Sequence, residues 1–167
     1  TLIPQVSPGA LWVEQRTRWE FPSGAVLQMG HAEHESDIYT FKSAQFNYIA
    51  FDELTTFTKL QYLFMFTRNR TTDATLPCVL RSATNPGDVG HEWVFKRFIS
   101  DRKPYKVYKE SVDVGGGRTH ETTLQFVPAT VFDNPRLANR DAYIAGLMQL
   151  DPSEREAMLY GRWDVFS

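Results

Sequence analysis

Two adjacent acidic residues that directly follow a short apolar segment are the side chains best placed to carry out chemistry. Residues 47–51 (NYIAF) are apolar without alternation, which is typical of a strand buried on both faces of a parallel sheet, and Asp52 and Glu53 come next. Open α/β sheets bind ligands where such strands end. An Asp there can hold the water shell of Mg²⁺, and the following Glu can activate a water for nucleotide hydrolysis. The plainer interpretation is a strand that ends in two acidic turn residues.

A second segment with small polar side chains closes the next apolar stretch. Residues 77–81 predict another buried strand. The four small residues that follow it are Ser82, Ala83, Thr84 and Asn85. If the two strands are parallel neighbours, these hydroxyl and amide groups lie beside the carboxylates and can contact a phosphate or the attacking water. An ordinary turn is the alternative, because Asn-Pro-Gly is strong turn chemistry.

The elements before and between these segments predict an α/β sheet. Residues 16–30 predict a β-hairpin, because two extended stretches flank a Pro-Ser-Gly turn. Phe57, Leu60, Leu63 and Phe64 follow at helical spacing, and the threonines just before them are candidate N-caps. Strands followed by helices are typical of an α/β fold.

The second half of the chain predicts a helix, two strands and a helical end. Asp88 can cap a helix whose apolar side includes Trp93, and residues 105–111 and 121–127 predict strands around three glycines. Asn134 with the proline after it predicts one C-terminal helix start. Asp151-Pro-Ser-Glu predicts another, in the pattern of a capping box, with Gly161 as its end.

Composition excludes several classes of protein. The chain has 167 residues, a formal charge of −2, 42% hydrophobic and 23% charged residues, which are close to globular averages. No apolar run has the length of a membrane span, and the first residues lack a signal-peptide pattern. The single cysteine excludes a disulfide framework and a cysteine-based zinc site, and favours an intracellular setting. The near-neutral charge gives no sign of a dedicated nucleic-acid-binding module.

Taken together, these motifs resemble one known family. The acidic motif YIAFDE followed by SATNPG is similar to the ATPase domain of the large terminase subunit of tailed bacteriophages. The hairpin WEFPSGAVLQMG resembles the family's strand-turn-strand unit. The later stretches FVPATVFDNPRLA and AGLMQLDPSEREAMLYGRWDV resemble the segment that joins the ATPase to the nuclease domain.

The resemblance implies a fold and a function. The fold would be part of a P-loop NTPase of the RecA type, with a mostly parallel sheet flanked by helices over residues 1–130 and a helical segment over residues 131–167. The function would be ATP-driven packaging of double-stranded viral DNA into a procapsid. The expected partners are DNA, the portal protein, the small terminase subunit and further copies of the chain in a ring, with no membrane. The expected location is the bacterial cytoplasm and, transiently, the procapsid portal, for a protein encoded by a phage or prophage.

The resemblance also implies roles for individual residues, with ATP as substrate and Mg²⁺ as cofactor. Asp52 corresponds to the Walker B acid, which holds Mg²⁺ through water, and Glu53 to the catalytic glutamate. The coupling motif, which links the nucleotide state to DNA movement, corresponds to Ser82, Ala83, Thr84 and Asn85. Lys42 is the nearest positional match to the family's basic phosphate finger, although a solvated loop lysine is the plainer interpretation.

Two parts of the family pattern are not found in this sequence. None of the six lysines follows a glycine, so the Walker A pattern G-x-x-x-x-G-K-[ST] has no match. In the family that loop precedes the hairpin, and the nuclease domain follows the Trp-Asp near the end. We therefore expect this chain to correspond to the back portion of the ATPase domain and to be inactive alone. The alternatives are a fragment of a helicase-like ATPase, since helicases also place Ser-Ala-Thr after an acidic pair, and a non-catalytic interaction or structural remnant of a terminase.

Overall fold

The computed structural model describes residues 2–166, whose contacts divide the chain between Thr40 and Phe41 into two units. Residues 131–166, expected as a separate helical segment, belong to the second unit together with residues 41–130. In the part of the chain that is described, no helix has both the length and the hydropathy of a membrane-spanning segment.

The first unit contains a three-stranded antiparallel sheet. Its elements are α1 (Ile3–Val6), β1 (Leu11–Val13), η1 (Glu14–Arg16), β2 (Arg18–Glu20), β3 (Val26–Gln28) and the start of η2 (Glu35–Phe41). Trp19 of β2 pairs with Trp12 of β1 and with Leu27 of β3, and the two indole rings lie 5.5 Å apart. The predicted hairpin over residues 16–30 is confirmed as β2 and β3, and Gly24 provides the positive φ of its turn.

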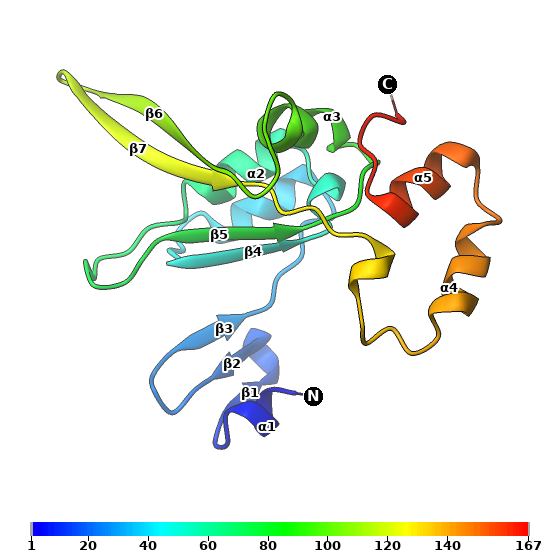
Figure 1. Ribbon diagram of the computed structural model, residues 1–167. Coiled ribbons are helices and arrows are strands. Elements are labelled where there is room, and N and C mark those ends of the chain that lie inside the picture. The colour runs from blue at the N-terminus through cyan, green and yellow to red at the C-terminus, as the bar shows by residue number, and fades with distance from the viewer. Residues whose placement is uncertain (1, 167) are drawn as a thin grey trace. The chain divides into compact units, whose positions relative to one another are not determined.

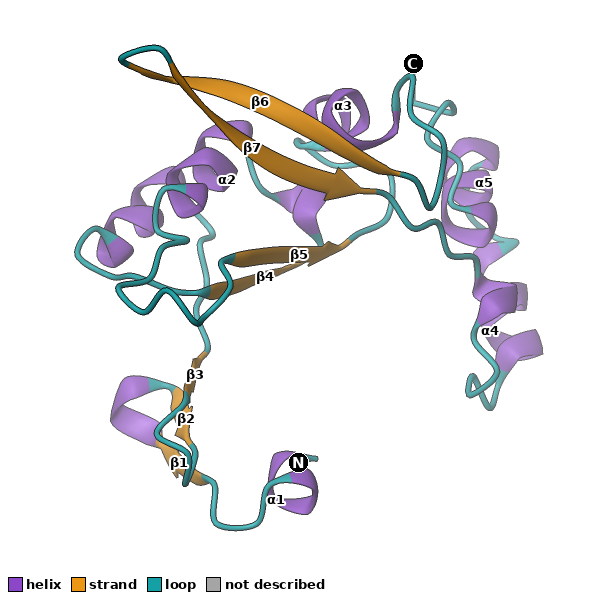
Figure 2. Ribbon diagram, turned by 60° about the vertical axis from the view of Figure 1, so that its left-hand side comes forward, coloured by secondary structure: helices purple, strands orange, loops and turns teal. Residues whose placement is uncertain are grey.

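The centre of the second unit is a parallel pair of strands, β4 (Tyr48–Asp52) and β5 (Val79–Ala83). Figures 1 and 2 show α2 (Lys59–Phe66) and α3 (His91–Val94) on the same side of this pair. The side chains of β4 alternate accordingly, with Ile49 and Phe51 buried and the other three residues exposed. The expectation of a strand buried on both faces was therefore wrong, because helices of this unit cover one face only.

Helix α2 begins with the predicted threonine cap, but its buried face differs from the prediction. The hydroxyl of Thr58 accepts the N–H of Gln61, and the Gln61 side chain accepts the N–H of Thr58 at 2.7 Å. This capping box turns Gln61 inward, where it is 3% exposed beside the buried Tyr62. Leu60 and Leu63, which the apolar spacing placed inside, are exposed.

The region around α3 packs very closely against the segment that follows β4, which includes η3 (Leu54–Thr56). The N–H of Gly90 donates to the carbonyl of Thr55 at 2.7 Å, and the indole N–H of Trp93 donates to the carbonyl of Phe57 at 2.9 Å. Gly90 is the N-cap of α3, so the expectation that Asp88 caps this helix was wrong. The helix continues as a π-helical turn, η4 (Phe95–Ile99).

A two-stranded antiparallel ribbon follows, formed by β6 (Val107–Gly115) and β7 (Arg118–Gln125). The predicted pair of strands with a glycine turn is confirmed, since Gly116 and Gly117 connect them in left-handed conformations. Figure 1 shows the tip of the ribbon projecting beyond the other elements of the second unit. Near its base Leu124 is buried, and Phe126 packs against the core.

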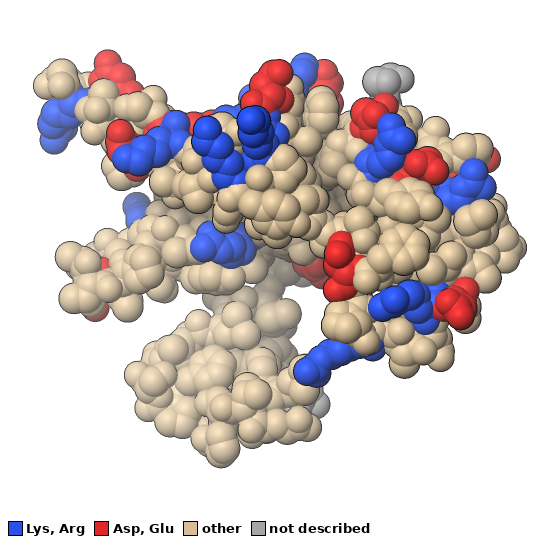
Figure 3. Space-filling model, viewed as in Figure 1, with Lys and Arg blue, Asp and Glu red and all other residues tan. Residues whose placement is uncertain are grey.

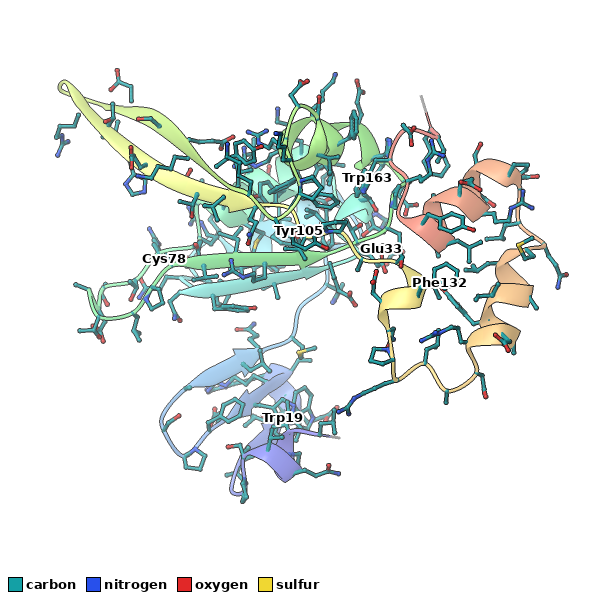
Figure 4. The ribbon with its side chains drawn as sticks, viewed as in Figure 1. Trp19, Glu33, Cys78, Tyr105, Phe132 and Trp163 are labelled. Carbon is teal, nitrogen blue, oxygen red and sulfur yellow. The ribbon has the colours of Figure 1, made fainter. Side chains whose placement is uncertain are left out.

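The C-terminal region contains η5 (Val131–Asp133), α4 (Arg140–Leu147) and α5 (Pro152–Tyr160). The helix expected to start at Asn134 was wrongly placed, because the Asn134 side chain accepts the N–H of Arg136 in a turn and the helix begins at Arg140. Helix α5 is confirmed, with Pro152 first and a left-handed Gly161 as its end, but Asp151 forms no side-chain cap bond. Trp163 then returns to the core (Figure 4).

The main hydrophobic core of the second unit joins β4, β5, η3, α2 and the α3–η4 helix with the residues after β7 and α5. Its buried members are Ile49, Phe51, Leu54, Tyr62, Val94 and Trp163. Aromatic contacts dominate, for example Phe51 against Tyr62 with ring centroids 5.6 Å apart. Burial of each such side chain stabilises the fold by about 1.5–3 kcal/mol. Because Ile49 and Phe51 of β4 belong to this core, the core holds the end of that strand in place.

Two glycines with opposite surroundings test this packing. A Cβ at Gly90 would lie 2.6 Å from the carbonyl oxygen of Phe57 and 2.7 Å from that of Thr55, whereas a Cβ at Gly146 in α4 meets nothing within 4 Å. We expect Gly90→Ala to lower the free energy of unfolding by about 1–3 kcal/mol through overpacking. Gly146→Ala should raise it by up to about 1 kcal/mol, because alanine favours the helix. Urea denaturation measures both, and equal effects would contradict the packing described.

Candidate functional site

The parallel pairing brings together the two segments that the sequence singled out. Asp52 lies opposite Ala83, so β4 and β5 end side by side at one edge. The Asp52 side chain is exposed and, among residues 2–166, forms neither a hydrogen bond nor an ion pair. Its carboxylate is therefore available to a ligand at the carboxyl end of the sheet.

Glu53 has a strained backbone. Its φ of 52° and ψ of 61° are left-handed, a conformation that costs a residue with a Cβ about 1–2 kcal/mol. The strain is maintained by η3, which Glu53 precedes as N-cap and in which the Thr56 N–H donates to the Glu53 carbonyl at 2.9 Å. The Glu53 carboxylate accepts the N–H of Asn85 at 3.4 Å, which is a long and weak bond. Strained residues of this kind concentrate at functional sites.

Two threonines, one buried and one half-buried, join the segments that follow the two strands. Thr55 is 1% exposed, and its hydroxyl lies 2.8 Å from the hydroxyl of Thr84. Thr84 also accepts the N–H of Thr55 at 3.0 Å, and the Thr55 hydroxyl lies 3.0 Å from the carbonyl of Asn85. This network satisfies the buried polar groups on both segments and fixes their relative position.

The same network continues to α3. The N–H of Gly87 donates to Nδ1 of His91 at 3.1 Å, so His91 accepts at this nitrogen. The His91 ring stacks on Trp163 with centroids 5.3 Å apart, and Thr55 accepts the N–H of Gly90. The segments after β4 and β5 are therefore both attached to the start of α3.

The four residues of the predicted coupling motif occupy different positions. Ser82 and Ala83 lie within β5, opposite Phe51 and Asp52, and both are exposed. Thr84 and Asn85 lie beyond the strand and belong to the hydrogen-bond network. The side-chain amide of Asn85 forms no hydrogen bond with any described residue, so it can contact a ligand. The structure thus brings Thr84 and Asn85 to Glu53 more directly than Ser82.

Lys42 is not brought to the acidic pair. The guanidinium of Arg68 donates to the Lys42 carbonyl, and the carbonyl of Arg68 accepts the N–H of Phe46, which comes just before β4. Lys42 is thereby attached at the amino end of β4, whereas Asp52 ends the strand. A five-residue strand at about 3.3 Å per residue separates its ends by about 13 Å. The lysine is exposed, as in the plainer interpretation of a solvated loop residue.

Thr55 is the site residue that the sequence reasoning missed. It was considered there only as a candidate helix cap, although it follows Glu53 by two positions. A hydroxyl so close to the acidic pair could have indicated a site residue, because a second hydroxyl, that of Thr84, directly follows the neighbouring strand. Gly90 and His91 carry no comparable signal, because only the packing of α3 brings them to this edge.

Among residues 2–166, the acidic side chains at this edge do not form a cluster of three metal-binding groups. In the described part of the chain, no three His, Cys, Asp or Glu side chains lie close enough together to hold a metal ion. This is also true of the loop at residues 31–35, which is rich in acidic residues and histidines. Mg²⁺ does not need such a group, since one or two carboxylates, water and substrate phosphates complete its shell. Asp52 and Glu53 each present one exposed carboxylate at this edge. Comparison of the chain with protein-family profiles, curated proteins and solved structures finds no significant match.

A double-mutant cycle tests the threonine network. Thr55→Val and Thr84→Val keep the side-chain shape but each leaves a buried polar partner unsatisfied, so each should lower the free energy of unfolding by about 1–3 kcal/mol. The double variant should cost less than the sum, with a coupling of about 0.5–3 kcal/mol, because the same bonds are removed twice. Urea denaturation of the four proteins measures the coupling. Additive effects would show that the two hydroxyls do not depend on each other.

Glycine substitutions test the strain at Glu53. Glu53→Gly should leave the free energy of unfolding unchanged or raise it by up to about 1 kcal/mol, because glycine adopts the left-handed region freely. Asp52→Gly, one residue earlier in extended backbone, should lower it by about 0.5–1 kcal/mol. Both variants remove one carboxylate, so they are matched in charge. Equal losses in urea denaturation would contradict stored strain at Glu53.

Proposed function

We propose that this chain is the part of a large terminase ATPase that carries the Walker B acids and the coupling motif. The observation that supports the proposal most directly is the arrangement at the carboxyl edge. A strained glutamate there follows an exposed aspartate and lies beside a threonine-asparagine segment on a parallel neighbour. P-loop motors hydrolyse nucleotides where a strand that ends in acidic residues lies beside a strand that ends in small polar residues. The proposed fold class is accordingly a partial P-loop NTPase of the RecA type.

The chemistry follows from the side chains at this edge. In the proposed reaction, Glu53 would orient a water and accept its proton while the water oxygen attacks the terminal phosphorus of ATP and ADP leaves. Its long bond to Asn85 leaves the carboxylate able to turn toward that water. Asp52 would hold the water shell of Mg²⁺, which when bound neutralises charge on the phosphates. Both carboxylates are exposed, which fits a substrate that arrives from solvent.

The threonine network gives the proposal a route from hydrolysis to movement. Asn85 accepts from Thr55 through its main chain and donates to Glu53, so a change at the terminal phosphate alters contacts on both segments. These segments are attached to α3 through Gly90 and His91. In the proposed motor, α3 and the ribbon would transmit this change to double-stranded DNA. The proposed partners of the motor are the portal protein, the small terminase subunit and further copies of the chain in a ring. The proposed location is the bacterial cytoplasm.

The test replaces the acids in the protein that carries this chain. Glu53→Gln should reduce DNA-stimulated ATP hydrolysis about 10²- to 10⁴-fold, because the amide cannot accept the proton of the attacking water. Asp52→Asn should raise the Mg²⁺ concentration needed for half-maximal rate. Phosphate release assays measure both, with Glu154→Gln at an exposed position of α5 as the matched control. Normal hydrolysis by Glu53→Gln with the fold retained would remove Glu53 from the catalytic role.

A further inference from the structure

A basic pocket lies between the start of α2, the α3–η4 helix and the base of β6. Its charged lining consists of Lys59, Glu92, Lys96, Arg97, Arg102 and Glu110. Trp93 forms an apolar part of the wall, and the cavity volume is about 440 Å³, which is within the usual range for sites of small ligands. None of the residues at the carboxyl edge lines this pocket, so it is a separate site.

Two arginines in the pocket share a single carboxylate. The terminal nitrogens of Arg97 and Arg102 lie 3.3 Å and 2.9 Å from the two oxygens of Glu110. Arg97 also lies over the ring of Tyr62 at 5.7 Å, and Arg102 over that of Tyr108 at 5.5 Å. Packing on the aromatic rings fixes both guanidinium planes in place before any ligand binds.

These guanidinium groups have more donors than the protein uses. A guanidinium has five N–H donors, and within residues 2–166 the buried Nε atoms of Arg97 and Arg102 have no hydrogen-bond partner. The Nε of Arg140, outside this pocket, is unpaired in the same way, and all three Nε atoms are almost inaccessible to solvent. The donors that a ligand in the pocket can reach are therefore the terminal nitrogens of the partly exposed Arg97 and Arg102.

The charge of the pocket indicates the kind of acceptor. Glu110 alone faces two arginines, Lys96 pairs with Glu92 at the exposed rim, and Lys59 has no ion-pair partner among the described residues. Figure 3 shows Lys and Arg side chains, interspersed with Asp and Glu, over α3 and the adjoining ribbon. Four cationic against two acidic side chains leave a net positive charge for a ligand to neutralise.

We propose that this pocket binds a phosphoryl group. A phosphate offers more acceptor oxygens than a carboxylate and matches two planar arginine forks, with a lysine as an additional point charge. It would contact the terminal nitrogens of the partly exposed Arg97 and Arg102 side chains and the ammonium group of Lys59, and it would compete with Glu110. The source is a free phosphate, a small phosphorylated molecule or the backbone of a nucleic acid. The proposal is independent of ATP hydrolysis at Asp52 and Glu53.

Titrations of the full chain by ¹⁵N NMR test the proposal. The probes are inorganic phosphate, pyrophosphate and a short DNA duplex, each at constant ionic strength maintained with chloride. We expect saturable shifts of the Arg97 and Arg102 Nε signals and of the Trp93 indole. Lys59→Gln should weaken binding about tenfold through loss of a charge-assisted bond. Arg136→Gln, in the exposed turn before α4, is the charge-matched control and should leave binding unchanged.

Glu110→Gln separates ligand binding from a purely structural ion-pair cluster. If Glu110 competes with the ligand, its neutral variant binds phosphate about threefold or more tightly. Weaker binding by Glu110→Gln, with an unchanged unfolding midpoint, would overturn the proposal, as would the absence of saturable shifts with all three probes. Binding of phosphate or pyrophosphate alone assigns a small ligand, and DNA binding that Lys59→Gln weakens assigns a phosphodiester backbone.

Discussion

The hydrogen bonds between Thr55 and Thr84 are the interaction on which the geometry of the carboxyl edge depends. Parallel pairing makes β4 and β5 end together, but pairing stops at Asp52 and Ala83. Beyond that point the hydroxyls of the buried Thr55 and the half-buried Thr84, 2.8 Å apart, take over from the main-chain bonds. Because Thr55 also accepts from Gly90, the same residue sets where α3 begins. Buried polar networks of this kind specify one arrangement when every member is satisfied.

The strained conformation of Glu53 follows from this constraint. After β4 the chain must turn so that Thr55, two residues beyond Glu53, comes within hydrogen-bond distance of Thr84. The left-handed conformation of Glu53 makes this turn. The core beneath the edge opposes relaxation, since Phe51 and Leu54 on either side of the turn are both buried. Glu53 therefore keeps a left-handed conformation that costs about 1–2 kcal/mol, and strained residues of this kind concentrate at functional sites.

Local patterns in the sequence predicted the elements better than the faces they bury. The extended segments at β2–β3, β4, β5 and β6–β7 and the cap of α2 are all encoded within a few residues. Leu60 and Leu63 are exposed because the capping box and Tyr62, not the count of apolar residues, decide which side of α2 packs on the core. Asp88 does not cap α3, since only Gly90 fits between Thr55, Phe57 and Trp93. These outcomes depend on contacts between distant segments, which no local pattern records.

Local sequence patterns are limited in the same way for the acidic edge and for the basic pocket. Contacts between distant segments also connect the edge with the pocket. Asp52 and Glu53 could be found from the sequence because they directly follow an apolar strand, whereas Arg97, Arg102 and Glu110 meet only after β6 folds back on α3. The indole of Trp93, in the pocket wall, donates to the carbonyl of Phe57, two residues after Thr55. A ligand that displaced this indole would therefore act on the segment that holds Glu53 in its strained conformation. In this structure, the hydrogen-bonded backbone from Glu53 to the first turn of α2 is the physical connection between an acidic edge and a basic pocket.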